Sequence, residues 1–247
     1  MKVFSVCGIS KSGKTTTIEY IVRELIARGY RVGTVKEIHF ENFAIDPDPN
    51  SNTARHRRAG SELVTARGLY ETDMMFSRKL AVREILSFYH GFDYVALEGV
   101  SDIPIPTIVT AHGVEDLELK WSDYVFCVSG VIANGKTEYN GVPAISAVSG
   151  DTALVDLIER KVYELLPDFE SRRCMACGCD CRKLGLKILH GEAKRSDCVA
   201  DRETELYING KRVDMVPSIL QRALLSVAGE LDGYRDGAEI EIKYKAF

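Results

Sequence analysis

The sequence predicts an α/β fold with a mostly parallel, doubly wound sheet, followed by a small α+β domain that contains cysteines. Two observations carry this prediction. Short apolar runs alternate with amphipathic segments along residues 1–168, which is the rhythm of strand–helix–strand units in a sheet covered on both faces. Five of the seven cysteines then fall between Cys174 and Cys198. We therefore expect two domains, at residues 1–168 and 169–247.

Each element of the first domain has its own signal. Residues 15–28 predict an amphipathic helix, because apolar residues recur there with helical spacing and Gly29 follows. Short apolar runs bounded by polar or glycine-containing segments predict strands at residues 2–7, 31–36, 62–66, 92–97, 107–110 and 123–128. Further helices are expected at residues 52–58, 78–90 and 151–166, the last of them stopped by Pro167.

The second domain is expected to mix helices and strands. A short helix is predicted at residues 182–190, after the cysteines, and a hairpin at residues 205–213 around the turn Asn209-Gly210. An apolar face predicts a helix at residues 217–231, and the alternation of Ile240 and Ile242 predicts a final strand at residues 238–244.

The composition excludes several classes of protein. The 247 residues are 45% hydrophobic and 28% charged, as in an ordinary globular protein. The formal net charge is −4, which argues against a chain that coats nucleic acid. No apolar run has the length of a membrane span, and the apolar start is too short for a signal peptide. We expect a cytoplasmic protein that binds neither nucleic acid nor membranes.

A phosphate-binding loop is the strongest functional signal. Residues 8–15, Gly-Ile-Ser-Lys-Ser-Gly-Lys-Thr, fit the pattern G-x-x-x-x-G-K-[ST] between a predicted strand and helix. Backbone amides of residues 10–16 are expected to hold phosphates at the helix N-terminus, with Lys14 on the outer phosphates. Lys11 is either a solvated surface charge or a phosphate contact across a dimer interface. The predicted nucleotide-binding residues are Gly8, Ser10, Lys11, Ser12, Gly13, Lys14, Thr15 and Thr16.

Two further groups are candidates for this site. Glu98 directly follows a predicted strand, where doubly wound folds place functional residues, so Thr15 and Glu98 are expected to hold Mg²⁺ or its water. His39, Arg55 and Arg57 are candidates for a second, phosphorylated ligand or an acidic partner, although a solvated helix face explains the two arginines equally well.

These motifs, in this order, resemble the MobB family of molybdopterin guanine dinucleotide biosynthesis. The resemblance covers about residues 1–166 and rests on the phosphate loop, Gly33-Thr34-Val35-Lys36-Glu37-Ile38-His39, the segment 55–60 and Leu97-Glu98-Gly99. It implies a dimeric, GTP-binding P-loop protein with weak GTPase activity. Such a protein assists the molybdenum cofactor guanylyltransferase that joins GMP to molybdopterin.

The sequence departs from that family pattern at three places. Glu37 stands where the family usually has His, Asn52-Thr53 replaces a common Asp-Ser pair, and Ser101 replaces a frequent Lys. No N-K-x-D element occurs, so the preference for guanine over adenine rests on the resemblance.

The cysteines carry a second, independent signal. The spacing Cys174-x2-Cys177-x3-Cys181-x16-Cys198 predicts a metal centre with these four ligands, and Cys179 is the expected non-ligand. The stretch resembles four-cysteine iron–sulfur domains, which implies a 4Fe–4S cluster, while Zn²⁺ is the alternative. Two other functions therefore stay open: a metallochaperone or cluster-delivery NTPase, and a redox-sensing adapter built on the same loop.

Overall fold

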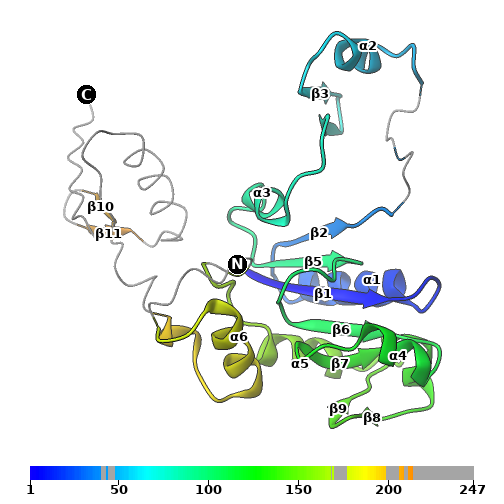
Figure 1. Cartoon of the computed structure of the whole chain (residues 1–247), viewed down its shortest axis with the longest axis vertical. Helices are drawn as coiled ribbons and strands as arrows, with labels where there is room; N and C mark the ends of the chain where they lie inside the picture. Colours follow the sequence, from blue (N-terminus) through cyan, green and yellow to red (C-terminus); the bar gives the residue numbers. More distant parts are fainter. Residues whose placement is uncertain are drawn as a thin grey trace. The chain divides into compact units, whose positions relative to one another are not determined.

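The computed structural model describes residues 1–39, 43, 48–167, 169, 177–198, 206–208 and 211–213, the last two ranges as backbone alone. The chain divides into two units, Met1–Glu164 and Leu165–Phe247 (Figure 1). None of the helices in these described ranges combines the length and the apolarity that a membrane crossing requires. The expected domain boundary at residues 168/169 stays a prediction.

A five-stranded sheet forms the centre of the first unit. Its order is β2 (Val32–Lys36), β5 (Tyr94–Glu98), β1 (Lys2–Gly8), β6 (Thr107–Thr110) and β7 (Val125–Ser129), and every neighbouring pair is parallel. The inner strands β5 and β6 are buried along their whole length, as expected for parallel strands covered on both faces. This confirms the predicted α/β fold with a parallel sheet.

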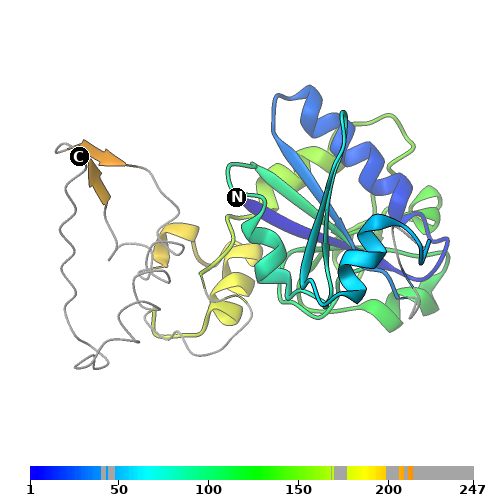
Figure 2. The same cartoon turned by 90° about the horizontal axis from the view of Figure 1, so that it is seen from above.

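Helices cover both faces of this sheet. α1 (Lys14–Ala27) and α5 (Ala153–Lys161) lie on one face, and α3 (Val82–Ser87) and α4 (Val114–Lys120) lie on the other (Figure 2). Right-handed crossovers explain the division. The connection from β1 to β2 and the connections from β2 to β5 and from β6 to β7 run in opposite directions across the sheet. The sheet is doubly wound, as predicted.

Two predicted helices are too long. The expected helix 78–90 is only six residues, Val82–Ser87. At its start the Glu84 carboxylate accepts from the amide of Ala81, and at its end the amides of Phe88 and Tyr89 donate to the carbonyls of Ile85 and Leu86 in tight turns. The expected helix 151–166 ends at Lys161, since Val162 is extended and Glu164 forms an antiparallel bridge with Lys2. Tertiary pairing overrides helical periodicity at both ends.

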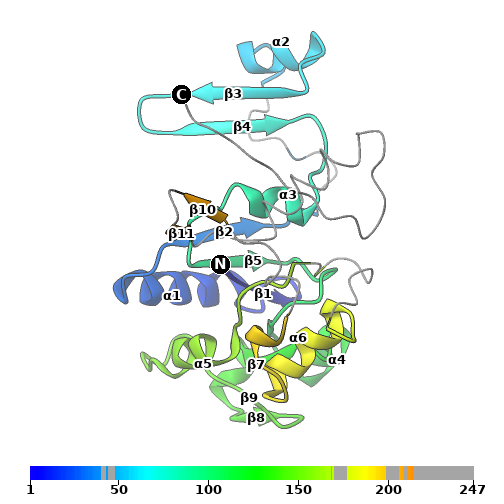
Figure 3. The same ribbon diagram turned by 90° about the vertical axis from the view of Figure 1, so that its left-hand side faces the viewer.

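A hairpin lies outside the main sheet. β3 (Leu63–Arg67) and β4 (Thr72–Phe76) form a two-stranded antiparallel sheet of their own, preceded by α2 (Asn52–Arg58) (Figure 3). The predictions of α2 and of the first strand are confirmed, but β4 was missed. Its sequence, Thr-Asp-Met-Met-Phe, has no clear alternation, and the pairing with β3 holds it in place.

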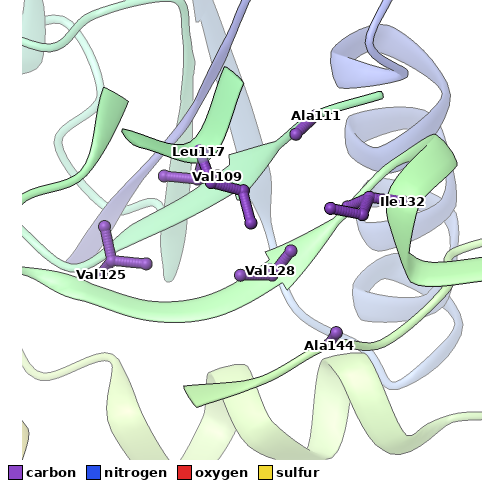
Figure 4. Close-up of a cluster of buried hydrophobic side chains, with 7 residues drawn as sticks. All are labelled: Val109, Ala111, Leu117, Val125, Val128, Ile132 and Ala144. Carbon is purple, nitrogen blue, oxygen red and sulfur yellow. The ribbon is translucent and has the colours of Figure 1, made fainter. Parts of the chain in front are cut away.

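A buried apolar cluster joins the β6–β7 half of the sheet to the segments that follow it (Figure 4). Leu117 of α4 packs there with Val109 and Val128, and so do Ile132 of the short 3-10 helix η1 (Val131–Asn134) and Ala144. Ala144 follows the small hairpin of β8 (Glu138–Tyr139) and β9 (Val142–Pro143) and bridges β7 in parallel. The cluster therefore fixes the chain beyond the carboxyl end of β7.

The described part of the second unit agrees with its predicted elements. α6 (Cys181–His190) begins at the N-cap Asp180, whose carboxylate accepts from the amide of Lys183. The 3-10 helix η2 (Arg195–Asp197) follows, and β10 (Leu206–Ile208) pairs with β11 (Lys211–Val213) as an antiparallel hairpin. The helix expected at 217–231 and the strand expected at 238–244 lie outside the described residues.

Candidate nucleotide-binding site

The loop between β1 and α1 is held closely against the ends of β6 and β7. Gly13 caps α1 with a left-handed backbone (φ +101°), which glycine adopts without steric cost. Gly130, just after β7, has φ +77°, and a Cβ there would lie 2.1 Å from the carbonyl oxygen of Ser12. At Gly8 a Cβ would lie 2.3 Å from the carbonyl oxygen of Thr110. Backbone approach on this scale requires glycine.

Ser12 acts as a structural residue of the loop. Its side chain is fully buried, and its hydroxyl lies 2.7 Å from Thr110 Oγ1 and donates to the Ile9 carbonyl at 2.9 Å. The hydroxyl is thus engaged within the protein. Any contact of Ser12 with a ligand falls to its backbone amide, in keeping with the predicted role of the amides of residues 10–16.

The Lys14 ammonium lies inside the curve of the loop. Nζ donates to the carbonyl oxygens of Gly8, at 3.0 Å, and Ile9. Burial lowers the pKa of Lys14, the nearby Lys36 and Lys120 lower it further, and Glu98 opposes the shift. An anionic ligand would reverse this effect, since it would stabilise the charged lysine.

Thr15 and Glu98 meet, as the sequence predicts. The Thr15 hydroxyl donates to Glu98 Oε1 at 3.1 Å, and Lys36 Nζ forms an ion pair with the same oxygen at 2.7 Å. Glu98 is 9% exposed and ends β5, while Lys36 ends the neighbouring strand β2. A hydroxyl and a carboxylate at this edge supply the oxygen ligands that Mg²⁺ prefers. The donor set therefore fits a magnesium ion.

A cleft of about 730 Å³ brings these groups together. His39 and Lys120 line it with the loop, and so do Glu37 and Ser101, two of the positions that depart from the family pattern. Neither Lys36 nor Lys120 was predicted from the sequence as a site residue. Lys36 carried a usable signal because it ends a strand beside Glu98, whereas Lys120 is the last residue of a helix with no motif of its own.

The other second-ligand candidates do not reach this cleft. Arg55 is exposed and Arg57 half-buried on α2, and neither lines the cleft that His39 lines. The structure therefore separates His39 from the two arginines, which the sequence analysis had grouped together.

The predicted metal ligands lie in the second unit. Cys181 and Cys198 are buried and Cys177 is half-buried, whereas Cys174 lies outside the described residues. Cys179, the expected non-ligand, is also half-buried. In the ranges that the structure describes, no three metal-ligating side chains come together. These residues alone do not assemble the predicted centre.

Curated relatives are similar to this chain over much of its length. A putative molybdopterin-guanine dinucleotide biosynthesis adapter protein of Methanocaldococcus jannaschii is 25% identical over 225 residues, covering 89% of this chain and 86% of its own. A probable adapter protein of the same name from Bacillus subtilis is 24% identical over 158 residues, covering 63% of this chain and 90% of its own. The archaeal alignment leaves out only about a tenth of this chain, so it extends into the second unit.

The fold has a counterpart among solved structures. The crystal structure of Bacillus subtilis MobB superposes with a TM-score of 0.53 at 23% identity, over 67% of this chain and all of that one. The family described as MobB, Molybdopterin guanine dinucleotide synthesis protein B, matches residues 3–129, which span the phosphate loop, Glu98 and the whole parallel sheet. This chain belongs to the MobB family.

Proposed function

We propose that this chain binds GTP with Mg²⁺ and acts as an adapter for the guanylyltransferase that attaches GMP to molybdopterin. The observation that carries the proposal is the cleft in which Lys14, Thr15 and Glu98 converge. Amides of residues 10–16 and Lys14 would hold the phosphates, while Thr15 and Glu98 would hold Mg²⁺ or its water. The relatives whose names specify this pathway support the choice of reaction.

The arrangement of charges favours an adapter with weak GTPase activity. Two carboxylates line the cleft, and both are held by lysines: Glu98 by Lys36 and Glu37 by Lys79. A carboxylate engaged in this way is a poor base for activating water. We therefore propose that the bound nucleotide is presented or exchanged more often than it is hydrolysed.

The proposal also includes a second ligand and a second copy of this chain. His39 at the cleft would contact a second ligand or the partner enzyme. Arg55 and Arg57 on α2, which do not line the cleft, would hold the pterin phosphate outside it or the partner enzyme. The β3–β4 hairpin exposes Leu69 (87%) and Tyr70 (97%) at its turn. Apolar side chains exposed to this degree support a homodimer that covers them.

The test is nucleotide binding by the purified chain, with and without Mg²⁺. We expect GTP to bind in preference to ATP, binding to be lost in Lys14→Ala, and the wild type to raise the yield of molybdopterin guanine dinucleotide with the guanylyltransferase. Arg78→Ala serves as the control, because this exposed arginine pairs with Glu84 and neither residue lines the cleft. Tighter binding of ATP than of GTP, or no effect on the guanylyltransferase, would contradict the proposal.

The cysteine spacing supports a separate proposal for the second unit. A metal centre on Cys174, Cys177, Cys181 and Cys198 would be a 4Fe–4S cluster, with Zn²⁺ as the alternative. The burial of Cys181 and Cys198 supports it, whereas the described residues do not bring three ligands together. A metallochaperone role would follow if metal left these cysteines during nucleotide hydrolysis.

Metal analysis and visible absorbance of anaerobically purified protein test this centre. Cys177→Ser is expected to lose the metal, and Cys179→Ser, the matched control two residues away, is expected to keep it. A wild-type chain purified without iron or zinc removes the metal centre from the proposal and leaves the nucleotide site unaffected.

A further inference from the structure

The surface just beyond the phosphate loop is built by η1. The amide of Val131 donates to the Ser12 carbonyl at 3.3 Å, so η1 begins in direct contact with the loop. A 3-10 helix rises about 2 Å per residue, which places Asn134 about 6 Å further along its axis. That is the scale of a ribose and a base. A nucleotide whose phosphates occupy the loop can extend over this helix.

A second segment lies beside η1. The Ser146 hydroxyl donates to Asn134 Oδ1 at 2.7 Å, and the Ser129 hydroxyl donates to the Ile145 carbonyl at 2.7 Å. These two bonds tie residues 145–146 to η1 and to the end of β7. Asn134 and Ser146 therefore form one polar unit at the carboxyl edge of the parallel sheet, where ligands bind in open α/β folds.

The core holds both segments in place. Ile132 is 8% exposed and Ala144 is 9% exposed, and both belong to the buried cluster of Figure 4. Each lies two residues from a member of the polar unit, Asn134 or Ser146 respectively. Recognition of a small planar ligand requires groups positioned in advance by a rigid scaffold. This anchoring provides such a scaffold.

Apolar side chains next to the polar unit are exposed. Val131, next to Ile132 of the core cluster, is 48% exposed, and Val148, two residues after Ser146, is 68% exposed. A nucleobase needs an apolar surface for its faces and polar groups for its edge. Two exposed valines and the Asn134–Ser146 pair provide both kinds of contact, next to a phosphate loop.

We infer that Asn134, oriented by Ser146, reads the base of the bound nucleotide and selects guanine. This inference rests on the proposed GTP binding and adds the residues that would determine its specificity. The chain reaches this selectivity without an N-K-x-D element. Val131 and Val148 form the apolar platform beside the base.

The hydrogen bond from Ser146 determines which base fits. It occupies Asn134 Oδ1, so the amide presents its Nδ2 donors, which bond no other residue among those that the structure describes. Guanine offers two acceptors, O6 and N7, on one edge, whereas adenine offers the acceptor N7 and the donor N6. An amide that only donates therefore suits guanine, and one with both Oδ1 and Nδ2 available suits adenine.

The variants Asn134→Ala and Ser146→Ala distinguish recognition of the base by Asn134 from a purely structural role of the two residues. Asn134 is exposed, and Ser146 is half-buried, so both variants are expected to fold, as thermal unfolding would verify. For Asn134→Ala we expect the ratio of ATP to GTP dissociation constants to fall by about tenfold, mainly through weaker GTP binding. For Ser146→Ala we expect ATP to bind more tightly than to the wild type, because the freed amide can turn to match adenine.

Lys136→Ala is the matched control, since this exposed residue follows η1 by two positions and is not a member of the polar unit of Asn134 and Ser146. Its nucleotide selectivity should equal that of the wild type. If the wild type prefers GTP and Asn134→Ala keeps that preference, the inference is overturned and the proposed function stands. If the wild type binds neither nucleotide, the proposed function itself fails. Equal wild-type affinity for GTP and ATP overturns the selection of guanine while leaving nucleotide binding intact.

Discussion

The Lys36 ammonium lies 2.7 Å from Glu98 Oε1, the same carboxylate oxygen that accepts the hydrogen bond of Thr15. A lysine thus occupies the position at which Mg²⁺ would approach Glu98. If Mg²⁺ binds as proposed, the two cations would compete for one carboxylate, and the magnesium would displace the ammonium or push it toward the phosphates. Lys36 is 56% exposed at its side chain, which leaves it free to move.

Replacing Lys36 should therefore ease magnesium binding. In Lys36→Ala, the Mg²⁺ concentration that half-saturates nucleotide binding should fall by up to about fivefold, the range expected for a partly exposed ion pair. Titration of Mg²⁺ at a fixed GTP concentration measures this half-saturating concentration. Lys79→Ala, which removes a similar ion pair with Glu37, should leave the midpoint unchanged. An unchanged midpoint in Lys36→Ala would show that Glu98 does not serve the metal.

As the pH rises, nucleotide affinity should decline at a lower pH than it would if Lys14 had the usual pKa of a lysine. Burial first, and then Lys36 and Lys120, lower the pKa of Lys14 below its usual 10.5. The phosphates need the charged ammonium, so affinity is full below the lowered pKa and falls as the pH rises through it. Bound phosphates raise this pKa again, and binding in that range takes up protons.

Calorimetry in buffers of different ionisation enthalpy detects this uptake. Lys14→Met should bind more weakly at every pH and should lose both the proton uptake and the alkaline decline. A decline of the same size in Lys14→Met would assign the titration to another group of the cleft.

The contact between Gly130 and the phosphate loop should be essential to the loop's shape. In Gly130→Ala a Cβ would lie 2.1 Å from the Ser12 carbonyl oxygen, and Gly130 has φ +77°. Gly150→Ala is a matched control, because Gly150 has φ +74° but nothing within 4 Å of its Cβ. Gly130 also has ψ −154°, a backbone region that is almost confined to glycine, so the backbone strain of an alanine there adds to the close contact.

The difference between these variants measures the steric contact together with the special backbone conformation of Gly130. We expect Gly130→Ala to lose more free energy of unfolding than Gly150→Ala. We also expect it to bind GTP at least tenfold more weakly, which corresponds to a loss of roughly 1.4 kcal/mol of binding free energy. Gly150→Ala should keep its affinity. Chemical denaturation and nucleotide titration measure the two effects, and equal losses in both variants would rule out the close contact as their cause.

The predictable part of the site is local in sequence. The strand, loop and helix of residues 2–28 lie next to one another in the chain, and Glu98 follows a buried run, so short patterns located them correctly. Lys120 could not be found this way, because it reaches the cleft only through the packing of α4 against the sheet. β4 was missed for the same reason, since its partner β3 and not its own pattern holds it.

Two of the candidate residues for a second ligand lie apart in the structure. His39 and Arg55 are separated by only sixteen positions in the printed sequence, yet only His39 lines the cleft. The direction of a chain between two elements depends on contacts distant in sequence, which composition does not reveal.

Anchoring of η1 in the core predicts that a buried substitution can alter base selectivity at a distance. Ile132 and Leu117 belong to the same buried cluster, and both substitutions to Ala should cost about 2–4 kcal/mol of unfolding free energy. Only Ile132 lies in η1, two residues before Asn134.

In Ile132→Ala the ratio of ATP to GTP dissociation constants should therefore fall, because Asn134 is no longer held in position. In Leu117→Ala both nucleotides should weaken together, since α4 carries Lys120 to the phosphate end of the cleft and does not contact the polar unit. Titration of both nucleotides against both variants below their unfolding temperatures measures the ratio. A ratio that changes equally in the two variants would mean that general loosening of the core, and not the position of η1, determines selectivity.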